Sequence, residues 1–194
     1  MHARERWQIE SGNAHLGFSL SHIVVSEIQG RFHRWGGEMS FDPDDVAATQ
    51  LRVWVDMASV DTGSAERDAH VKSPEFLDVA RFPRAEFTST AVTTRRDGEA
   101  AVTGILQLHG TTREVELIVV AQQTSLDERG VMRAAYTAHG EIDRQAFGLR
   151  WNQDLDFGGV VVGDRVRIEA RFEMVRTADM DFASATGSAS PADA

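Results

Sequence analysis

The sequence predicts an all-β protein whose short strands form either a closed barrel or a sandwich. Apolar and polar residues alternate through residues 102–109, so Leu106 and Leu108 are expected on one face of a strand. Gln107 and His109 are then expected on the opposite face. Roughly eight or more segments repeat this pattern at the spacing typical of barrels and sandwiches, and helix signals are few. One apolar wall shared by so many strands could hold a ligand.

The predicted strands carry apolar residues at every second position, which is the period of a strand with one buried face. They are residues 16–20, 28–32, 39–41, 51–57, 87–91, 102–109, 115–119, 132–142 and 165–172. Glycine, proline and aspartate favour turns. We therefore expect turns at Gly36-Gly37, at Asp42-Pro43-Asp44-Asp45 and at Gly110-Thr111-Thr112. The last of these joins two strands as an antiparallel hairpin.

Two segments carry helix-start signals. Ser73 precedes Pro74 and Glu75, which is the order of a capping residue, a proline in the first helical position and an acid in the first turn. The buried side of that helix would be formed by Phe76, Leu77 and Val79. Ser64 is expected to begin a second short helix that runs to Val71.

Composition narrows the class of protein. The length of 194 residues fits one domain. The absence of cysteine excludes disulfides, a thiolate nucleophile and a cysteine-based zinc site. The formal net charge of −10 argues against nucleic acid and anionic membrane surfaces as partners. Residues 177–194 are mainly small and polar, so we expect a disordered tail there.

The apolar content of the chain also bears on its location. No apolar stretch approaches the ~20 residues that span a bilayer, so we expect no membrane insertion. The charged start at residues 1–6 is not followed by the apolar region of a signal peptide. We therefore expect a cytoplasmic protein, or a periplasmic one if a signal was removed.

No motif indicates a catalytic or metal centre. There is no Gly-x-Ser-x-Gly nucleophile elbow, and the glycines of residues 158–163 lack dinucleotide-binding spacing. His139-Gly140-Glu141 matches half of a zinc deaminase signature, whose cysteines are missing. Glu66 and His70 could share a helix face, but a metal needs three or more ligands. We therefore predict a non-enzymatic protein without a catalytic residue, metal site or cofactor.

Two alternatives stay open from the residues alone. The seven histidines could converge from separate strands, which would suit a haem- or metal-dependent enzyme or redox module. The ten Phe and four Trp could instead fill the interior, because a small eight-stranded barrel either fills with side chains or holds one ligand. A self-filled barrel would suit a stress-response or interaction protein.

A set of polar residues forms a further candidate site. It consists of His22, Asp61, Arg67, Asp68, His70 and Arg144. Charged groups near a core are usually paired, so one interpretation is a salt-bridged cluster that closes one end of a barrel. The other interpretation is that these side chains contact the polar headgroup of a ligand.

Several short blocks occur in a specific order along the chain. They are Trp7-Gln8-Ile9-Glu10, Phe18-Ser19-Leu20-Ser21-His22, Ile28-Gln29-Gly30-Arg31-Phe32, Ser59-Val60-Asp61-Thr62, Arg67-Asp68-Ala69-His70-Val71-Lys72-Ser73, Phe82-Pro83, Phe87-Thr88-Ser89, Gly104-Ile105-Leu106-Gln107-Leu108-His109-Gly110-Thr111-Thr112, Arg144, Phe147-Gly148 and Val162-Gly163-Asp164-Arg165-Val166-Arg167-Ile168. In order and spacing these blocks resemble the YceI family, lipocalin-like proteins that bind polyisoprenoid or related long-chain lipids. The likeness covers residues 7–176, nearly everything before the tail.

The resemblance implies a lipocalin-like, extended antiparallel β-barrel of about eight strands, with one or two short helices and a hydrophobic central pocket. The residues expected to face inward and line this pocket are Phe18, Leu20, Ile28, Phe32, Val53, Val55, Phe87, Leu106, Leu108, Leu117, Val119, Val166 and Ile168. The polar candidates would orient a headgroup. The resemblance also implies pairing as a homodimer.

The function that follows is a soluble, non-catalytic carrier. Its ligand would be a polyisoprenoid, an isoprenoid quinone-like lipid or a fatty-acyl amphiphile. Burying a long tail requires no catalyst, and each buried methylene contributes ~0.8 kcal/mol, so a long chain gains affinity from its length.

Overall fold

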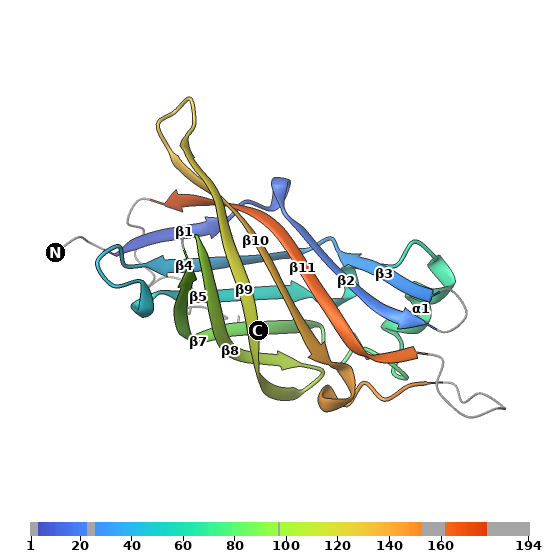
Figure 1. Ribbon diagram of the computed structural model, residues 1–194. Coiled ribbons are helices and arrows are strands. Elements are labelled where there is room, and N and C mark those ends of the chain that lie inside the picture. Colours follow the sequence, from blue (N-terminus) through green and yellow to red (C-terminus); the bar gives the residue numbers. More distant parts are fainter. Residues whose placement is uncertain (1–3, 23–25, 97, 153–161, 178–194) are drawn as a thin grey trace, which may run out of the picture.

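Figure 1 shows the computed structural model of the chain, which describes residues 4–22, 26–96, 98–152 and 162–177. Its strands are β1 (Glu5–Ile9), β2 (His15–His22), β3 (Ser26–Phe32), β4 (Trp35–Phe41), β5 (Gln50–Asp56), β6 (Val60–Asp61), β7 (Arg84–Arg96), β8 (Glu99–Leu108), β9 (Thr111–Leu126), β10 (Met132–Asp143) and β11 (Val162–Thr177). The helical elements are α1 (Ala65–Lys72) and short 3-10 turns at Ser11–Asn13, Val46–Ala48, Met57–Ser59 and Arg144–Phe147.

Eight strands close into a barrel. Their order is β1-β4-β5-β7-β8-β9-β10-β11, and β11 pairs back with β1. Every pairing in this ring is antiparallel. The prediction of an all-β, extended antiparallel barrel of about eight strands with a short helix is confirmed, and the sandwich alternative is excluded.

Strand β11 belongs to two parts of the sheet. Residues 174–177 pair with β1, whereas β2 pairs with positions between Val162 and Arg171. Strands β3 and β6 then extend the sheet beyond β2, outside the closed ring. Figure 1 shows the antiparallel pair β2–β3 on the side of the molecule where α1 lies, so this extension forms the wall at the α1 end of the barrel.

The alternation of the sequence sets which side chains enter the barrel. In β8, Leu108 is buried while its neighbour Gln107 is exposed. Across the β7–β8 ladder Phe87 lies opposite Leu106, so both side chains face the same interior. The period of two therefore predicted the inner face of this hairpin correctly.

The predicted turn at Gly36-Gly37 is wrong, because both glycines lie within β4. A Cβ at Gly37 would lie 2.5 Å from the carbonyl oxygen of Arg52, so the missing side chain lets β4 and β5 approach closely. The chain bends earlier, at His33 and Arg34. The turn predicted at residues 42–45 is confirmed, with the Asp44 N–H donating to the Asp42 carboxylate at 3.0 Å.

The β8–β9 turn lies one residue earlier than predicted. His109 and Gly110 form a two-residue loop with φ of 50° and 70°. Thr111 and Thr112 already belong to β9. Two-residue hairpin loops need such left-handed conformations, which glycine adopts freely and histidine rarely. The prediction failed because the strand alternation continues through His109.

One of the two predicted helices forms. The Ser64 Oγ caps α1 by accepting a hydrogen bond from the Arg67 N–H at 3.4 Å. The helix predicted after Ser73 is wrong. The Leu77 N–H donates instead to the Val71 carbonyl at 3.0 Å, which folds this segment back on the end of α1 as a series of turns.

The end of the described chain differs from the prediction by one residue. Thr177, the first residue of the predicted tail, ends β11, and its Oγ1 donates to the Arg6 carbonyl at 3.3 Å. Residues 178–194 and residues 158–161 of the glycine-rich segment lie outside the described residues. Among the described residues, no helix is long and apolar enough to cross a membrane.

Candidate functional site

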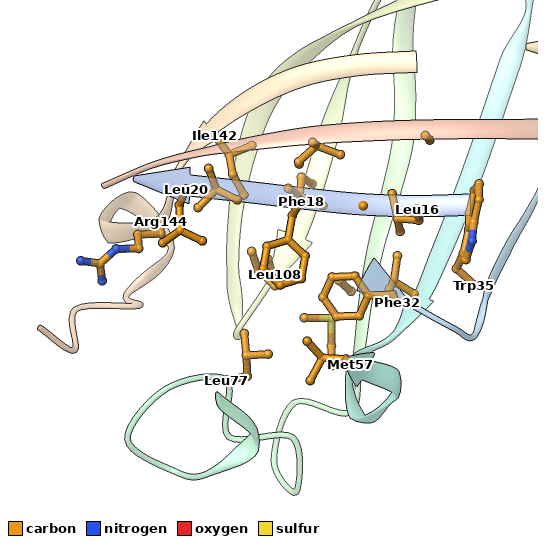
Figure 2. Close-up of a pocket in the computed structure, with 18 of the residues that line it drawn as sticks. Leu16, Phe18, Leu20, Phe32, Trp35, Met57, Leu77, Leu108, Ile142 and Arg144 are labelled. Atoms are coloured by element: carbon orange, nitrogen blue, oxygen red, sulfur yellow. The ribbon is translucent and has the colours of Figure 1, made fainter. Parts of the chain in front are cut away.

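The barrel encloses an apolar cavity of about 340 Å³. This volume lies within the range of roughly 300–1,000 Å³ that is typical of small-molecule sites. Figure 2 shows Phe18, Phe32 and Leu108 in this space, between Arg144 at one end and Trp35 at the other. A barrel filled by its own side chains does not agree with this cavity.

Every side chain that the sequence predicts for the inner wall lines the cavity. These residues are Phe18, Leu20, Ile28, Phe32, Val53, Val55, Phe87, Leu106, Leu108, Leu117, Val119, Val166 and Ile168. They come from both the closed ring and the β2–β3 extension, so one continuous apolar surface runs along the interior. Their contact with a ligand stays a prediction.

The predicted wall was incomplete. The residues that it lacked include Leu16, Trp35, Met57, Val60, Thr62, Leu77, Leu149, Trp151 and Phe172. Phe172 continues the alternation of Val166 and Ile168 along β11, so the period of two could have found it. Met57, Leu77 and Leu149 lie outside the strands, where that period gives no signal.

Aromatic side chains fill the end of the cavity at Trp35. The rings of Trp35 and Phe172 meet edge to face with their centroids 5.8 Å apart, and the two residues are only 4% and 8% exposed. Tyr136 stacks on Phe172 at 5.6 Å, and burial raises the pKa of its phenol. Trp7 and Met174 pack into the same cluster but are not part of the cavity wall. The cavity is therefore closed at this end.

Polar side chains gather at the opposite end, beside α1. Arg67 and His70 project from α1 into the cavity wall, and His22 joins them from the end of β2. Arg67 is held in place by Thr62: its Nε donates to the Thr62 Oγ1 at 2.9 Å and its Nη2 to the Thr62 carbonyl at 2.7 Å. The side chain of His70 is 35% exposed, so this end of the cavity reaches the surface.

His70 also contacts two neighbouring side chains. Its ring meets the Trp151 ring edge to face with centroids 4.5 Å apart. Its Nε2 lies 3.2 Å from the Glu75 carboxylate, yet among the described residues this buried nitrogen has no hydrogen-bond partner of acceptable geometry. The Glu75 carboxylate is therefore the polar group that the structure places next to this histidine nitrogen.

Arg144 lines the cavity but has a positioning role. The residue is 1% exposed, and its Nε donates to the Gly163 carbonyl at 2.9 Å. Its Nη1 and Nη2 donate to further acceptors: the carbonyls of Leu149, Trp151 and Val162 and the carboxylate of Asp164. Burial lowers the pKa of the Arg144 guanidinium, and the charge of Asp164 opposes this shift. Because its N–H groups donate to protein acceptors, Arg144 holds the segment at Leu149–Trp151 against the start of β11 at the cavity end.

The two predicted aspartates do not line the cavity. Asp68 accepts hydrogen bonds from the N–H and Oγ1 of Thr62, at 2.8 and 2.6 Å, and so fixes the residue that holds Arg67. Asp61 follows the buried Val60 in β6, so strand alternation turns its side chain outward.

Asp61 binds partners on the outer surface. It accepts hydrogen bonds from the Gly63 N–H at 2.8 Å and from Arg31, and it lies 2.9 Å from the His33 Nε2. These interactions, the Gly63 N–H first among them, lower the pKa of the Asp61 carboxyl to about 2. Its role is to stabilise the β3–β6 edge.

Within the described ranges, no group of three or more His, Asp or Glu side chains could hold a metal ion. The metal-dependent alternative therefore gains no support from the geometry of this part of the chain.

These features define a class of protein: a closed antiparallel β-barrel with a ligand-sized apolar interior and polar groups at one end. The sequence model of the YceI-like domain matches residues 7–174, and the chain belongs to this family. The resemblance stated from the sequence is confirmed.

Bacterial relatives are similar to this chain over most of their length. A UPF0312 protein of Pseudomonas syringae pv. tomato is 37% identical over 141 residues, which cover 73% of this chain and 73% of the relative. A UPF0312 protein of Vibrio cholerae is 33% identical over 141 residues, which cover 73% of this chain and 75% of the relative.

Solved structures share the fold at lower identity. BcnA of Burkholderia cenocepacia gives a TM-score of 0.74 at 22% identity, covering 85% of this chain and 98% of BcnA. A Saccharophagus degradans domain, described as polyisoprenoid binding, gives 0.66 at 17% identity and covers 88% of this chain and 98% of that domain. At such identities the likeness shows the fold alone.

Proposed function

We propose that this protein is a non-catalytic carrier that holds the tail of a long-chain amphiphilic lipid in its barrel. The ligand class is a polyisoprenoid, an isoprenoid quinone-like lipid or a fatty-acyl chain. The observation that carries the proposal is the cavity itself, which has apolar walls along its length and polar side chains at one end.

The chemistry of the wall suits a hydrocarbon tail. Leu20, Phe18 and Leu16 follow one another along β2 from the Arg144 end to the Trp35 end (Figure 2). Four strand residues span ~13 Å, so the tail would lie along the barrel wall. Each methylene that leaves water for this wall contributes ~0.8 kcal/mol, and none needs a hydrogen bond.

The polar end suits a headgroup. Arg67 keeps its orientation through Thr62, and the His70 Nε2, which lies 3.2 Å from the Glu75 carboxylate, makes no hydrogen bond within the described part of the chain. A few convergent polar groups are sufficient to fix the orientation of a ligand in an otherwise apolar pocket. The Saccharophagus domain with the same fold, described as polyisoprenoid binding, supports the same ligand class.

The test is the recovery of bound lipid. Native mass spectrometry and organic extraction of the purified protein should yield a long-chain lipid, and titration with farnesol or palmitic acid should saturate. Val53→Trp, which fills the cavity, should abolish binding. Arg52→Trp, one residue away on the outer face of β5, should leave binding unchanged.

Two results would contradict the carrier. One is a protein that yields no lipid and binds none on titration. The other is a stoichiometric haem or metal, detected by Soret absorbance or elemental analysis, that is lost in His22→Ala or His70→Ala.

A further inference from the structure

The cavity is open at one end and blind at the other. At the α1 end its wall includes the partly exposed His70 and Arg67. At the far end its lining includes Trp35 and Phe172, which are both buried, together with Ile9 of β1 and Leu51 of β5. Figure 2 shows Trp35 at the end of the space, next to Leu16 and away from Arg144. A tail that enters beside α1 therefore advances toward these two rings.

The blind end is backed by further packing. Trp35 and Phe172 belong to a buried cluster with Trp7 and Met174, which lie beyond the cavity wall. Met174 is 1% exposed, so the side chain that follows Phe172 on the same face of β11 is also buried. Tyr136 stacks on Phe172 from the paired strand β10. The two lining rings are therefore held from several strands and cannot yield easily to a longer tail.

The residues just before this end are small. Ala138 of β10 pairs with Ala170 of β11, and both line the cavity. Ala170 lies two residues before Phe172 on the same face of the strand. The side-chain size along β11 thus changes abruptly from alanine to phenylalanine at the point where the cavity ends.

We propose that Trp35 and Phe172 are a length stop, which sets the longest hydrocarbon tail that the barrel can bury. This inference rests on the proposed lipid-binding function and adds the residues that determine its selectivity. A tail shorter than the cavity leaves apolar wall uncovered. A tail longer than the cavity keeps its surplus methylenes in water at the α1 end, where they add no affinity.

The expected signature is a plateau in affinity along a homologous series. Each added methylene should raise the affinity about fourfold while it is still buried, and the gain should end when the tail reaches the stop. The probes are straight-chain saturated fatty acids from decanoic to tetracosanoic acid, with farnesol, geranylgeraniol and solanesol as a second series. Dissociation constants are measured by displacement of a fluorescent fatty acid.

Three variants locate the stop. Trp35→Ala removes one of its two rings, so the plateau should move to longer tails. Ala170→Leu fills the space before it, so the plateau should move to shorter tails. Trp54→Ala is the matched control: Trp54 lies on the outer face of β5, is 38% exposed and is not part of the cavity wall, so its plateau should equal that of the wild type. Circular dichroism identifies any variant that does not fold. Because Trp35→Ala and Ala170→Leu should shift the plateau in opposite directions, one folded variant of the two is sufficient to test the stop.

The outcomes separate the two proposals. If the folded variants and the wild type reach their plateau at the same length, the length stop is overturned while lipid binding stands. If the wild type gains affinity without limit along the series, the stop is overturned as well. If it binds no member of either series, the proposed function itself fails.

Discussion

The Nη2 of Arg144 donates a hydrogen bond to the Oδ1 of Asp164 at 3.2 Å, although Arg144 is buried and Asp164 is on the surface. The guanidinium thereby connects the surface of β11 with the interior of the barrel. Its other hydrogen bonds end on the backbone carbonyls of Leu149, Trp151, Val162 and Gly163. The segment that follows β10 and the start of β11 therefore depend on one side chain.

Replacing this side chain should destabilise the protein strongly. Arg144→Met leaves buried carbonyl groups without donors, and the free energy of unfolding should fall by about 3–5 kcal/mol. Urea denaturation measures the change. Arg165→Met is the control, because Arg165 is exposed and pairs with Glu141 on the surface, so its effect should stay within about 0.5 kcal/mol. Equal effects of the two substitutions would contradict the positioning role of Arg144.

A charge on the inner wall should be poorly tolerated. Leu108 is 7% exposed and lines the cavity, so Leu108→Asp places a carboxylate in an apolar site without a partner. We expect a loss of several kcal/mol in thermal or urea unfolding, or a protonated carboxyl. Gln107→Asp, on the outer face, should cost less than about 1 kcal/mol, even though it faces Glu86 across the ladder. An unchanged melting temperature for Leu108→Asp would show that the side chain faces outward.

The fit of Phe87 over Gly104 provides a test of packing. A Cβ at Gly104 would lie 2.4 Å from the Phe87 Cζ and 2.5 Å from the Thr88 carbonyl oxygen. Gly104→Ala should therefore lower the free energy of unfolding by about 1–3 kcal/mol and push the Phe87 ring into the cavity. At Gly12 a Cβ would meet no atom within 4 Å, so Gly12→Ala should melt like the wild type. Identical melting curves for both variants would contradict the contact.

The lowered pKa of Asp61 predicts how its contribution to the stability of the β3–β6 edge changes with pH. The Gly63 N–H, His33 and Arg31 lower its pKa from 3.8 to about 2, so the folded state binds a proton less readily than the unfolded chain. The stabilisation is present above pH 3.8 and is lost as the pH falls toward 2. The difference in unfolding free energy between wild type and Asp61→Asn should therefore shrink across this window. Denaturation at a series of pH values measures it, and a constant difference contradicts the assignment.

The inner wall could be predicted because its signal is local. In β8 and β11 the period of two places Leu106, Leu108, Val166 and Ile168 on one face, and the antiparallel register keeps that face inside. The closure of the ring was harder to predict from the sequence, because it depends on pairing between β1 and β11 at opposite ends of the described chain. The resemblance to a family, rather than the alternation, selected the barrel over the sandwich.

The polar end could be predicted only in part. Arg67 and His70 reach the cavity because Ser64 starts α1 at the residue that the capping signal indicates. The outward direction of Asp61 could have been derived from its neighbour Val60. The burial of Arg144 could not, since its acceptors come from two segments that are separated along the chain and meet only in the folded barrel.

Strand β11 both closes the ring and pairs with β2, and this has a consequence for folding during synthesis. This strand hydrogen-bonds to β1, β2 and β10, and it follows all of them along the chain. A nascent polypeptide that has not yet emerged past Val162 exposes three unpaired edges, and such edges invite association between chains. Ring closure must therefore await the synthesis of β11, and contacts of such high sequence separation make folding slow.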